Sequence, residues 1–214
     1  MNAIETPYLV LGGDIRRSRD RVDRAALQTR LEASLARVNV RFDRDLAAPL
    51  SVVQGDAFQG LLRRPAAAMP LVVALELALQ PVSFRIGLGW GALATPMRPT
   101  TASMDGPAFH RAHEALEAAR AGEAWLVARG LPDPDQPVFD GLVSLLGAVR
   151  DGWTASQRRA VSARREQPTG KAAAAAAGVS PPAMSRALRA AHYAEVLMAE
   201  AAVASLLSRL GDAP

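Results

Sequence analysis

The chain has 214 residues, half of them hydrophobic, and a formal net charge of +4 at pH 7. It contains no cysteine, which excludes disulfides, thiolate nucleophiles and cysteine-ligated zinc, so any metal must be bound by oxygen or histidine. No apolar run approaches the roughly 20 residues that a membrane-spanning helix needs, and we expect a globular cytoplasmic protein of one or two domains that makes no membrane contact.

The first predicted elements are a strand, a turn and a helix. The continuous apolar run Tyr8–Leu11 predicts a strand that is covered on both faces of a sheet. Gly13 and Asp14 follow it and predict a turn, because glycine accepts positive φ and aspartate bonds its own backbone. Apolar residues then recur at three-to-four spacing from Val22 to Val38, which predicts an amphipathic helix.

A second Gly-Asp pair lies between two short apolar segments. Leu50–Gln54 and Phe58–Leu62 flank Gly55 and Asp56, a pattern that predicts a β-hairpin with Asp56 at its tip. Two carboxylates at neighbouring strand ends can share a hard cation such as Mg2+. Taken singly, each Gly-Asp pair is more typical of an ordinary structural turn than of a catalytic site, and that alternative stays open.

The rest of the first half continues this mixed pattern. The predicted elements are a helix at 65–80, a strand at 82–90, a loop at 94–106, a helix at 107–121 and a short strand at 124–128. Glycines in the strand at 82–90 indicate close approach of another backbone or of a ligand. Three prolines mark 130–137 as a linker, and every later segment has a helical pattern. The sequence therefore predicts two domains, 1–130 and 137–214.

Three local motifs resemble the catalytic core of class III nucleotidyl cyclases and, more distantly, GGDEF cyclases and polymerase palms. They are Gly55-Asp56-Ala57-Phe58-Gln59-Gly60-Leu61, Phe84-Arg85-Ile86-Gly87-Leu88-Gly89-Trp90-Gly91 and Asp105-Gly106-Pro107-Ala108. Together with Gly13-Asp14-Ile15 and the helical C-terminal part, they make nearly the whole chain resemble the SatD family. The resemblance implies an α+β fold: a ferredoxin-like, cyclase-like palm followed by an all-α helix-turn-helix domain.

The resemblance also implies a metal–nucleotide site. The metal, Mg2+ or Mn2+, is expected on Asp14 and Asp56, with the backbone carbonyl of Ile15 as a further ligand. Backbone amides at a helix start and arginine side chains suit phosphate. The expected nucleotide-binding residues are Arg16, Arg17, Ser18, Arg19, Gly55, His110 and Arg111.

Several of these residues have a structural interpretation beside the functional one. His110 and His113 are three apart, a spacing that suits a metal, but without a third ligand they are typical of a helix surface. Asp105 is expected to cap the helix that begins near Pro107, and Ser18 is a candidate N-cap.

The C-terminal part predicts a helix-turn-helix at about 170–191. Small alanines, Ala174 among them, let two helices cross closely, Gly178 supplies the turn, and Ser180 caps the second helix. Val179, Met184 and Leu188 are expected in its core.

Positive charge concentrates in this part of the chain. Residues 151–189 carry seven cationic against two acidic residues, a net charge of +5, which is the electrostatic footprint of a nucleic-acid-binding surface. The expected DNA-binding residues are Ser180, Pro182, Ala183, Ser185, Arg186, Arg189, Lys171, Arg158 and Arg159. The alternative is a helical appendage that packs on a neighbour or a partner chain.

Three functions fit the pattern. The first is a transcription regulator that couples binding of a metal–nucleotide, such as a nucleoside triphosphate, to DNA binding. The second is an active nucleotidyl cyclase or nucleotidyltransferase, although the asparagine and arginine that cyclases carry after the third motif are replaced by Phe109–Glu114. The third is a scaffold without activity. A homodimer is expected, because cyclase-like sites and helix-turn-helix proteins are commonly paired.

Overall fold

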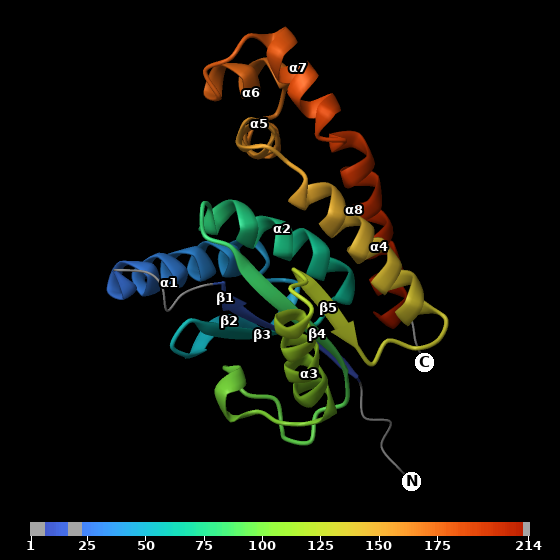
Figure 1. The fold of residues 1–214 in the computed structure, drawn as a ribbon. Coiled ribbons are helices and arrows are strands. Elements are labelled where there is room, and N and C mark those ends of the chain that lie inside the picture. The colour runs from blue at the N-terminus through green and yellow to red at the C-terminus, as the bar shows by residue number, and fades with distance from the viewer. Residues whose placement is uncertain (1–6, 17–22, 212–214) are drawn as a thin grey trace. The chain divides into compact units, whose positions relative to one another are not determined.

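A five-stranded sheet forms the centre of the first part of the chain (Figure 1). The computed structural model describes residues 7–16 and 23–211. The strands are β1 (Tyr8–Ile15), β2 (Leu46–Gln54), β3 (Ala57–Leu62), β4 (Phe84–Gly91) and β5 (Leu126–Arg129). Their order in the sheet is β2-β3-β1-β4-β5, with every pair antiparallel except β4 and β5.

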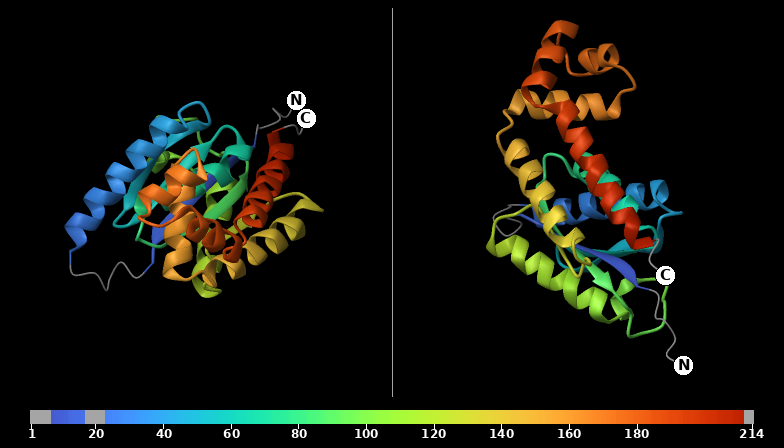
Figure 2. Two further views of the ribbon diagram at one scale, coloured as in Figure 1. Left: turned by 90° about the horizontal axis from the view of Figure 1, so that it is seen from above. Right: turned by 90° about the vertical axis from the view of Figure 1, so that its right-hand side faces the viewer.

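Three helices cover the two faces of this sheet. Helices α1 (Arg24–Arg41) and α2 (Ala68–Leu79) pack against each other on one face, and α3 (Pro107–Ala121) covers the other (Figures 1 and 2). Short 3-10 segments, η2 (Pro65–Ala67) and η3 (Thr101–Ser103), precede α2 and α3. The order β1-α1-β2-β3-α2-β4 in this sheet is the ferredoxin-like arrangement, so the predicted α+β class is confirmed.

The glycines of β4 let α3 lie directly on the sheet. A Cβ atom added at Gly89 would lie 2.1 Å from the backbone oxygen of Ala108, and one at Gly87 would lie 2.4 Å from that of Ala112. The close approach that these glycines predict is therefore that of a helix backbone, one of the two alternatives that the sequence left open.

The prediction of a turn at Gly13-Asp14 is wrong. Strand β1 continues through both residues: Gly13 pairs with Phe58 of β3 and with Ile86 of β4, and Asp14 pairs with Arg85. Pairing with strands on both sides satisfies the backbone groups that a turn would otherwise have to satisfy locally. The hairpin prediction is confirmed, since a turn at Gly55 and Asp56, with φ of +58° at Gly55, joins β2 to β3.

The later part of the chain is helical, as predicted. Its helices are α4 (Asp135–Asp151), α5 (Ala155–Glu166), α6 (Gly170–Ala176), α7 (Pro181–Ala190), α8 (Tyr193–Ser208) and the 3-10 segment η4 (Arg209–Gly211). Among the described residues no single helix is long and apolar enough to cross a bilayer; the bent pair 181–190 and 193–211 reaches that length and composition only jointly.

The chain divides into two compact units at a different place from 130–137. The first unit extends to Val143 and includes the chain from Val203 onward, and the second is Ser144–Ala202. The predicted linker does not separate them, because α4 begins at Asp135 and its first turns belong to the first unit. Phe139 is fully buried there, and the indole of Trp125 donates to the carbonyl of Val143.

Small side chains build the second unit. Ala160 of α5, Ala173 and Ala174 of α6 and Met184 of α7 form one buried cluster, as expected for helices that cross closely. Trp153, before α5, is buried and its Nε1 donates to the carbonyl of Ala191.

Candidate functional site

Both predicted aspartates lie at the same end of the sheet. The β1–β3 register pairs Gly13 with Phe58, so Asp14 lies one residue beyond that pair, beside the start of β3. The turn that contains Asp56 directly precedes β3. The register therefore supports the expected proximity of the two strand ends, while the sharing of a cation by the two carboxylates stays a prediction.

Asp14 lies on the face of the sheet that α3 covers. Val10 belongs to a core cluster with residues of α3, and side chains alternate along a strand, so Asp14 shares that face. From the last turn of α3, Arg120 Nε donates to Asp14 Oδ2 over 2.7 Å. Arg85, the β4 partner of Asp14, places Nη1 4.0 Å from the other oxygen, Oδ1.

Polar atoms in this cluster lack hydrogen-bond partners among the described residues. Asp14 is only 8% exposed, and its Oδ1 is buried without a partner, as are Nε of Arg85 and Nε of Arg16. A buried polar atom left unpaired costs about 1–3 kcal/mol, and more when it is charged. Charged side chains of both signs that keep such atoms without a hydrogen-bond partner at one strand end are typical of a site that a ligand completes.

The charges in the cluster nearly balance. Arg120 also contacts the carboxylate of Glu117, one turn earlier on α3. Burial lowers the pKa of Arg120, but the hydrogen bond and charge of Asp14 and those of Glu117 outweigh it, so that the pKa is raised overall. Arg120 is therefore cationic at any physiological pH. Its guanidinium group contacts the carboxylates of Asp14 and Glu117, and that of Arg85 lies near Asp14 alone.

The predicted residues His110 and Arg111 do not lie at the end of the sheet that carries Asp14. Arg111 Nη1 donates to the carbonyl of Trp90 over 2.7 Å, and His110 Nε2 lies 2.9 Å from Asp105 Oδ1. These contacts lie at the start of α3, whereas Arg120 is ten residues further along, which is about 15 Å of helix.

The sequence matches the SatD family over residues 8–192. The chain belongs to the SatD family. Among solved structures, a bacterial light-regulated adenylyl cyclase is similar, with 16% sequence identity and a TM-score of 0.44. That similarity covers 57% of the SatD chain and 43% of the cyclase chain, so the SatD chain spans less than half the length of that protein. No curated protein matches the sequence.

Other predicted ligands in this SatD protein have structural contacts or lie outside the described residues. Arg16 donates from Nη2 to the carbonyls of Glu123 and Ala124, which ties the end of β1 to the loop before β5. Ile15 is buried and pairs with Phe84. Arg17, Ser18 and Arg19 lie outside the described residues.

The predicted cap at Asp105 is wrong. Gly106 occupies the N-cap position of α3 and no side chain caps the helix. Asp105 instead accepts from the amide of Gly106 and contacts His110, because the φ of 143° at Gly106 turns the chain before the helix starts.

Sequence reasoning missed Arg85, Glu117 and Arg120 as members of the site. Arg85 could have been predicted from strand pairing, because the antiparallel register of β1 and β4 places it opposite Asp14. Arg120 carries no local signal: it is 106 residues from Asp14, and only the placement of α3 on the sheet brings it there.

In the second unit of this SatD protein, most of the predicted DNA-binding residues are on the surface. Ser180 caps α7 by accepting from the amide of Ala183, which is half-buried. The exposed members are Ser180, Pro182, Ser185, Arg186, Arg189, Lys171, Arg158 and Arg159. The predicted core position of Val179 is wrong, since it is 43% exposed, whereas Met184 is buried. Gly178 supplies the turn with φ of +67°.

Proposed function

We propose that the first unit binds a metal–nucleotide at the Asp14 end of the sheet. The observation that carries this proposal is the buried carboxylate of Asp14, whose Oδ1 has no hydrogen-bond partner among the described residues. Beside it lies room: a Cβ atom at Gly12, on the same face, would meet nothing nearer than a backbone oxygen at 4.0 Å. A ligand that offers both cation and phosphate would pair with the carboxylate and with the arginines.

The residues fit a cation that is shared with a phosphate-rich ligand. Among the described residues no group of three or more histidine or acidic side chains is placed to hold a metal. Mg2+ commonly takes one or two carboxylates and completes its shell with phosphate and water. Asp14 Oδ1 and the carboxylate of Asp56 supply such a pair of donors, and when bound the cation would neutralise phosphate charge.

Arg120 and Arg85 are the proposed phosphate contacts. Guanidinium groups bind phosphate with two parallel donors. Arg120 engages Asp14 through Nε, and Arg85 Nε has no described partner, so donors remain available to an anion that approaches Asp14.

We propose binding rather than turnover. The side chains that stand where cyclases place their transition-state groups, His110 and Arg111, are held at the other end of α3 by Asp105 and by the carbonyl of Trp90. A reaction at Asp14 would therefore have neither of these two side chains available from the same chain.

Asp14→Asn is expected to weaken Mg2+-dependent nucleotide binding at least about tenfold, because a neutral amide cannot bind the cation as a carboxylate does. Asp56→Asn, a change of nearly equal shape in the β2–β3 turn, should do the same. Binding is measured by titrating fluorescent analogues of each nucleoside triphosphate with Mg2+ or Mn2+. The matched control is Asp105→Asn, an exposed carboxylate at the start of α3, which should bind as the unmodified protein does.

Mass spectrometry of the same mixtures separates sensor from enzyme. Binding without a product supports the sensor. A cyclic or transferred nucleotide product that disappears in Asp56→Asn would establish the nucleotidyl cyclase or transferase alternative instead. Absence of both binding and product would support the third alternative, a scaffold without activity.

We further propose that the second unit binds DNA through α7, which makes the protein a regulator in which nucleotide binding is coupled to DNA binding. Exposed cations and hydroxyls on α7 support this, with Arg189 Nη1 donating to Ser185 Oγ over 3.0 Å on the helix surface. A dimer would present two such helices to paired half-sites.

The double variant Arg186→Ala, Arg189→Ala is expected to weaken DNA binding and to make its salt dependence shallower. Each lost phosphate contact lowers the slope of log K against log salt by about one. Fluorescence anisotropy of a labelled duplex over a range of salt concentrations measures this. Arg98→Ala, an exposed arginine of the first unit, is the control. An unchanged slope in the double variant would place recognition elsewhere.

A further inference from the structure

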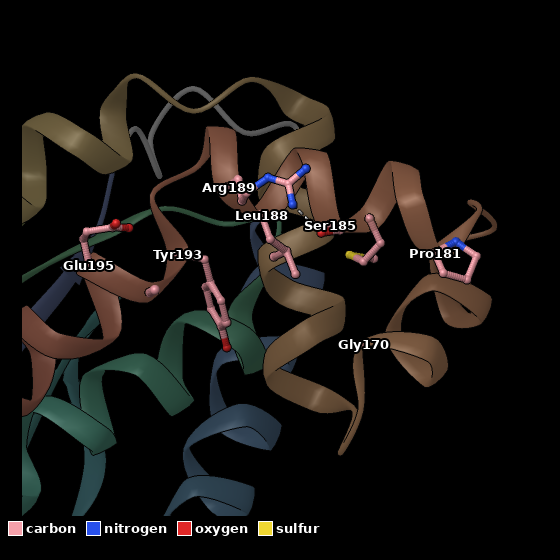
Figure 3. A pocket seen from close by; sticks show the side chains of 9 residues that line it. Gly170, Pro181, Ser185, Leu188, Arg189, Tyr193 and Glu195 are labelled. Carbon is pink, nitrogen blue, oxygen red and sulfur yellow. Dashed lines mark hydrogen bonds between the residues drawn. The ribbon is translucent and has the colours of Figure 1, made fainter.

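A cavity of about 520 Å³ opens in the second unit (Figure 3). Its lining comes from the start of α6, from α7 and from the first turn of α8, and therefore from one unit alone. Cavities that take small organic ligands measure roughly 300 to 1,000 Å³. The cavity is thus large enough for a ligand of that kind, and the metal–nucleotide site does not account for it.

The lining combines an apolar wall with a small set of polar groups. Met184 and Leu188 supply apolar surface, and Arg189, Ser185 and Tyr193 supply donors. Such a mixture is typical of small-molecule sites, where apolar walls give affinity and a few polar groups fix orientation. Arg189 is exposed and hydrogen-bonded to the hydroxyl of Ser185, so both groups can turn to a ligand without breaking a buried contact.

The charges favour an anion at the α7 end of the cavity. Arg189 and Glu195 are the two charged residues of the lining. Figure 3 shows the carboxylate of Glu195 apart from the paired Ser185 and Arg189. A carboxylate or sulfonate placed at Arg189 therefore gains a charge-assisted hydrogen bond, with the hydroxyl of Ser185 beside it as a second donor.

We propose that this cavity binds a small organic anion with an apolar body. Its acidic group pairs with Arg189 and Ser185, and its body covers Met184 and Leu188. Ser185 and Arg189 also belong to the proposed DNA-binding surface, so the anion and DNA compete for them. This competition rests on the proposed DNA binding, whereas the anion site itself does not.

The test of the site uses 8-anilinonaphthalene-1-sulfonate, an aromatic sulfonate whose fluorescence rises on transfer to an apolar site. Titration of the full chain is expected to give saturable binding that Arg189→Gln weakens about tenfold, the loss expected for one charge-assisted hydrogen bond. Arg186→Gln is the matched control, because Arg186 is an exposed arginine on the same helix that does not line the cavity, and its affinity should stay within about twofold.

Glu195→Gln distinguishes an anion site from a site for cations or zwitterions. Loss of its negative charge should leave binding of the probe unchanged or make it tighter. The proposal is overturned if Arg186→Gln weakens binding as much as Arg189→Gln, or if Glu195→Gln is the variant that loses binding.

The competition is read by adding the same probe to the protein bound to a labelled duplex. Saturating probe should raise the apparent Kd for DNA, also in Arg186→Gln. DNA affinity that is unaffected by saturating probe would overturn the competition. A protein that binds no DNA at all would refute the proposed DNA binding, while the direct titration still decides the anion site.

Discussion

Replacing Glu200 with alanine is expected to lower the free energy of unfolding of the second unit by about 3–5 kcal/mol. Arg165 Nη2 of α5 donates to Glu200 Oε1 of α8 over 2.6 Å, and the two side chains are only 7% and 10% exposed. Without Glu200, the guanidinium stays buried with no counter-charge. Removal of one partner of a buried pair is costly for this reason, even where the intact pair adds little.

Hydrogen exchange of the amides of α5 and α8, measured by mass spectrometry across a urea series, gives this free energy for the second unit. The double variant Arg165→Met, Glu200→Met is expected to recover most of the loss, because no buried charge remains. Asp45→Ala provides the surface comparison in the first unit, where urea unfolding followed by circular dichroism measures the loss. Its pair with Arg64, whose side chain is 63% exposed, should contribute less than about 1 kcal/mol. Equal losses of unfolding free energy in Glu200→Ala and in the double variant would show that lost packing, and not the unpaired buried charge, causes the destabilisation.

Local chemistry was sufficient to predict the hairpin and the helices. Gly55 needs positive φ and Asp56 tolerates a turn, so the β2–β3 connection follows from its own residues. Gly13 and Asp14 have the same turn chemistry but lie inside β1, because strands on both sides offer them backbone partners. Sequence patterns do not show which strands become neighbours. For this reason the sequence did not distinguish the Gly-Asp pair inside a strand from the one in a turn.

The candidate site was predictable only where the chain itself positions its members. The hairpin carries Asp56 to the strand end beside Asp14 through the pairing of β3 with β1. Arg120 reaches Asp14 from α3 through tertiary packing that no periodicity encodes. His110 and Arg111 belong to the motif that the cyclase resemblance indicated, yet about ten residues of rigid helix separate them from Arg120, so a shared motif did not imply a shared site.

Gly89→Ala is expected to destabilise the first unit by about 3 kcal/mol or more, at the upper end of the cost of overpacking a core. The added methyl would lie 2.1 Å from the carbonyl oxygen of Ala108 and 2.2 Å from the amide nitrogen of Ala112. Both are backbone atoms of α3, which cannot rotate aside as a side chain can. Urea unfolding followed by circular dichroism measures the loss.

Gly12→Ala is the matched control, because its methyl would meet only a backbone oxygen at 4.0 Å, and it should be neutral or slightly stabilising. The comparison also tests the site. Any accommodation of the methyl added at Gly89 must lift α3 from the sheet, and α3 carries Arg120 to Asp14 at its far end. Folded Gly89→Ala protein should therefore bind the metal–nucleotide more weakly than the unmodified protein, although Gly89 lies well away from Asp14. Unchanged affinity would mean that the position of Arg120 does not matter to the ligand, and that the arginine only neutralises the carboxylate.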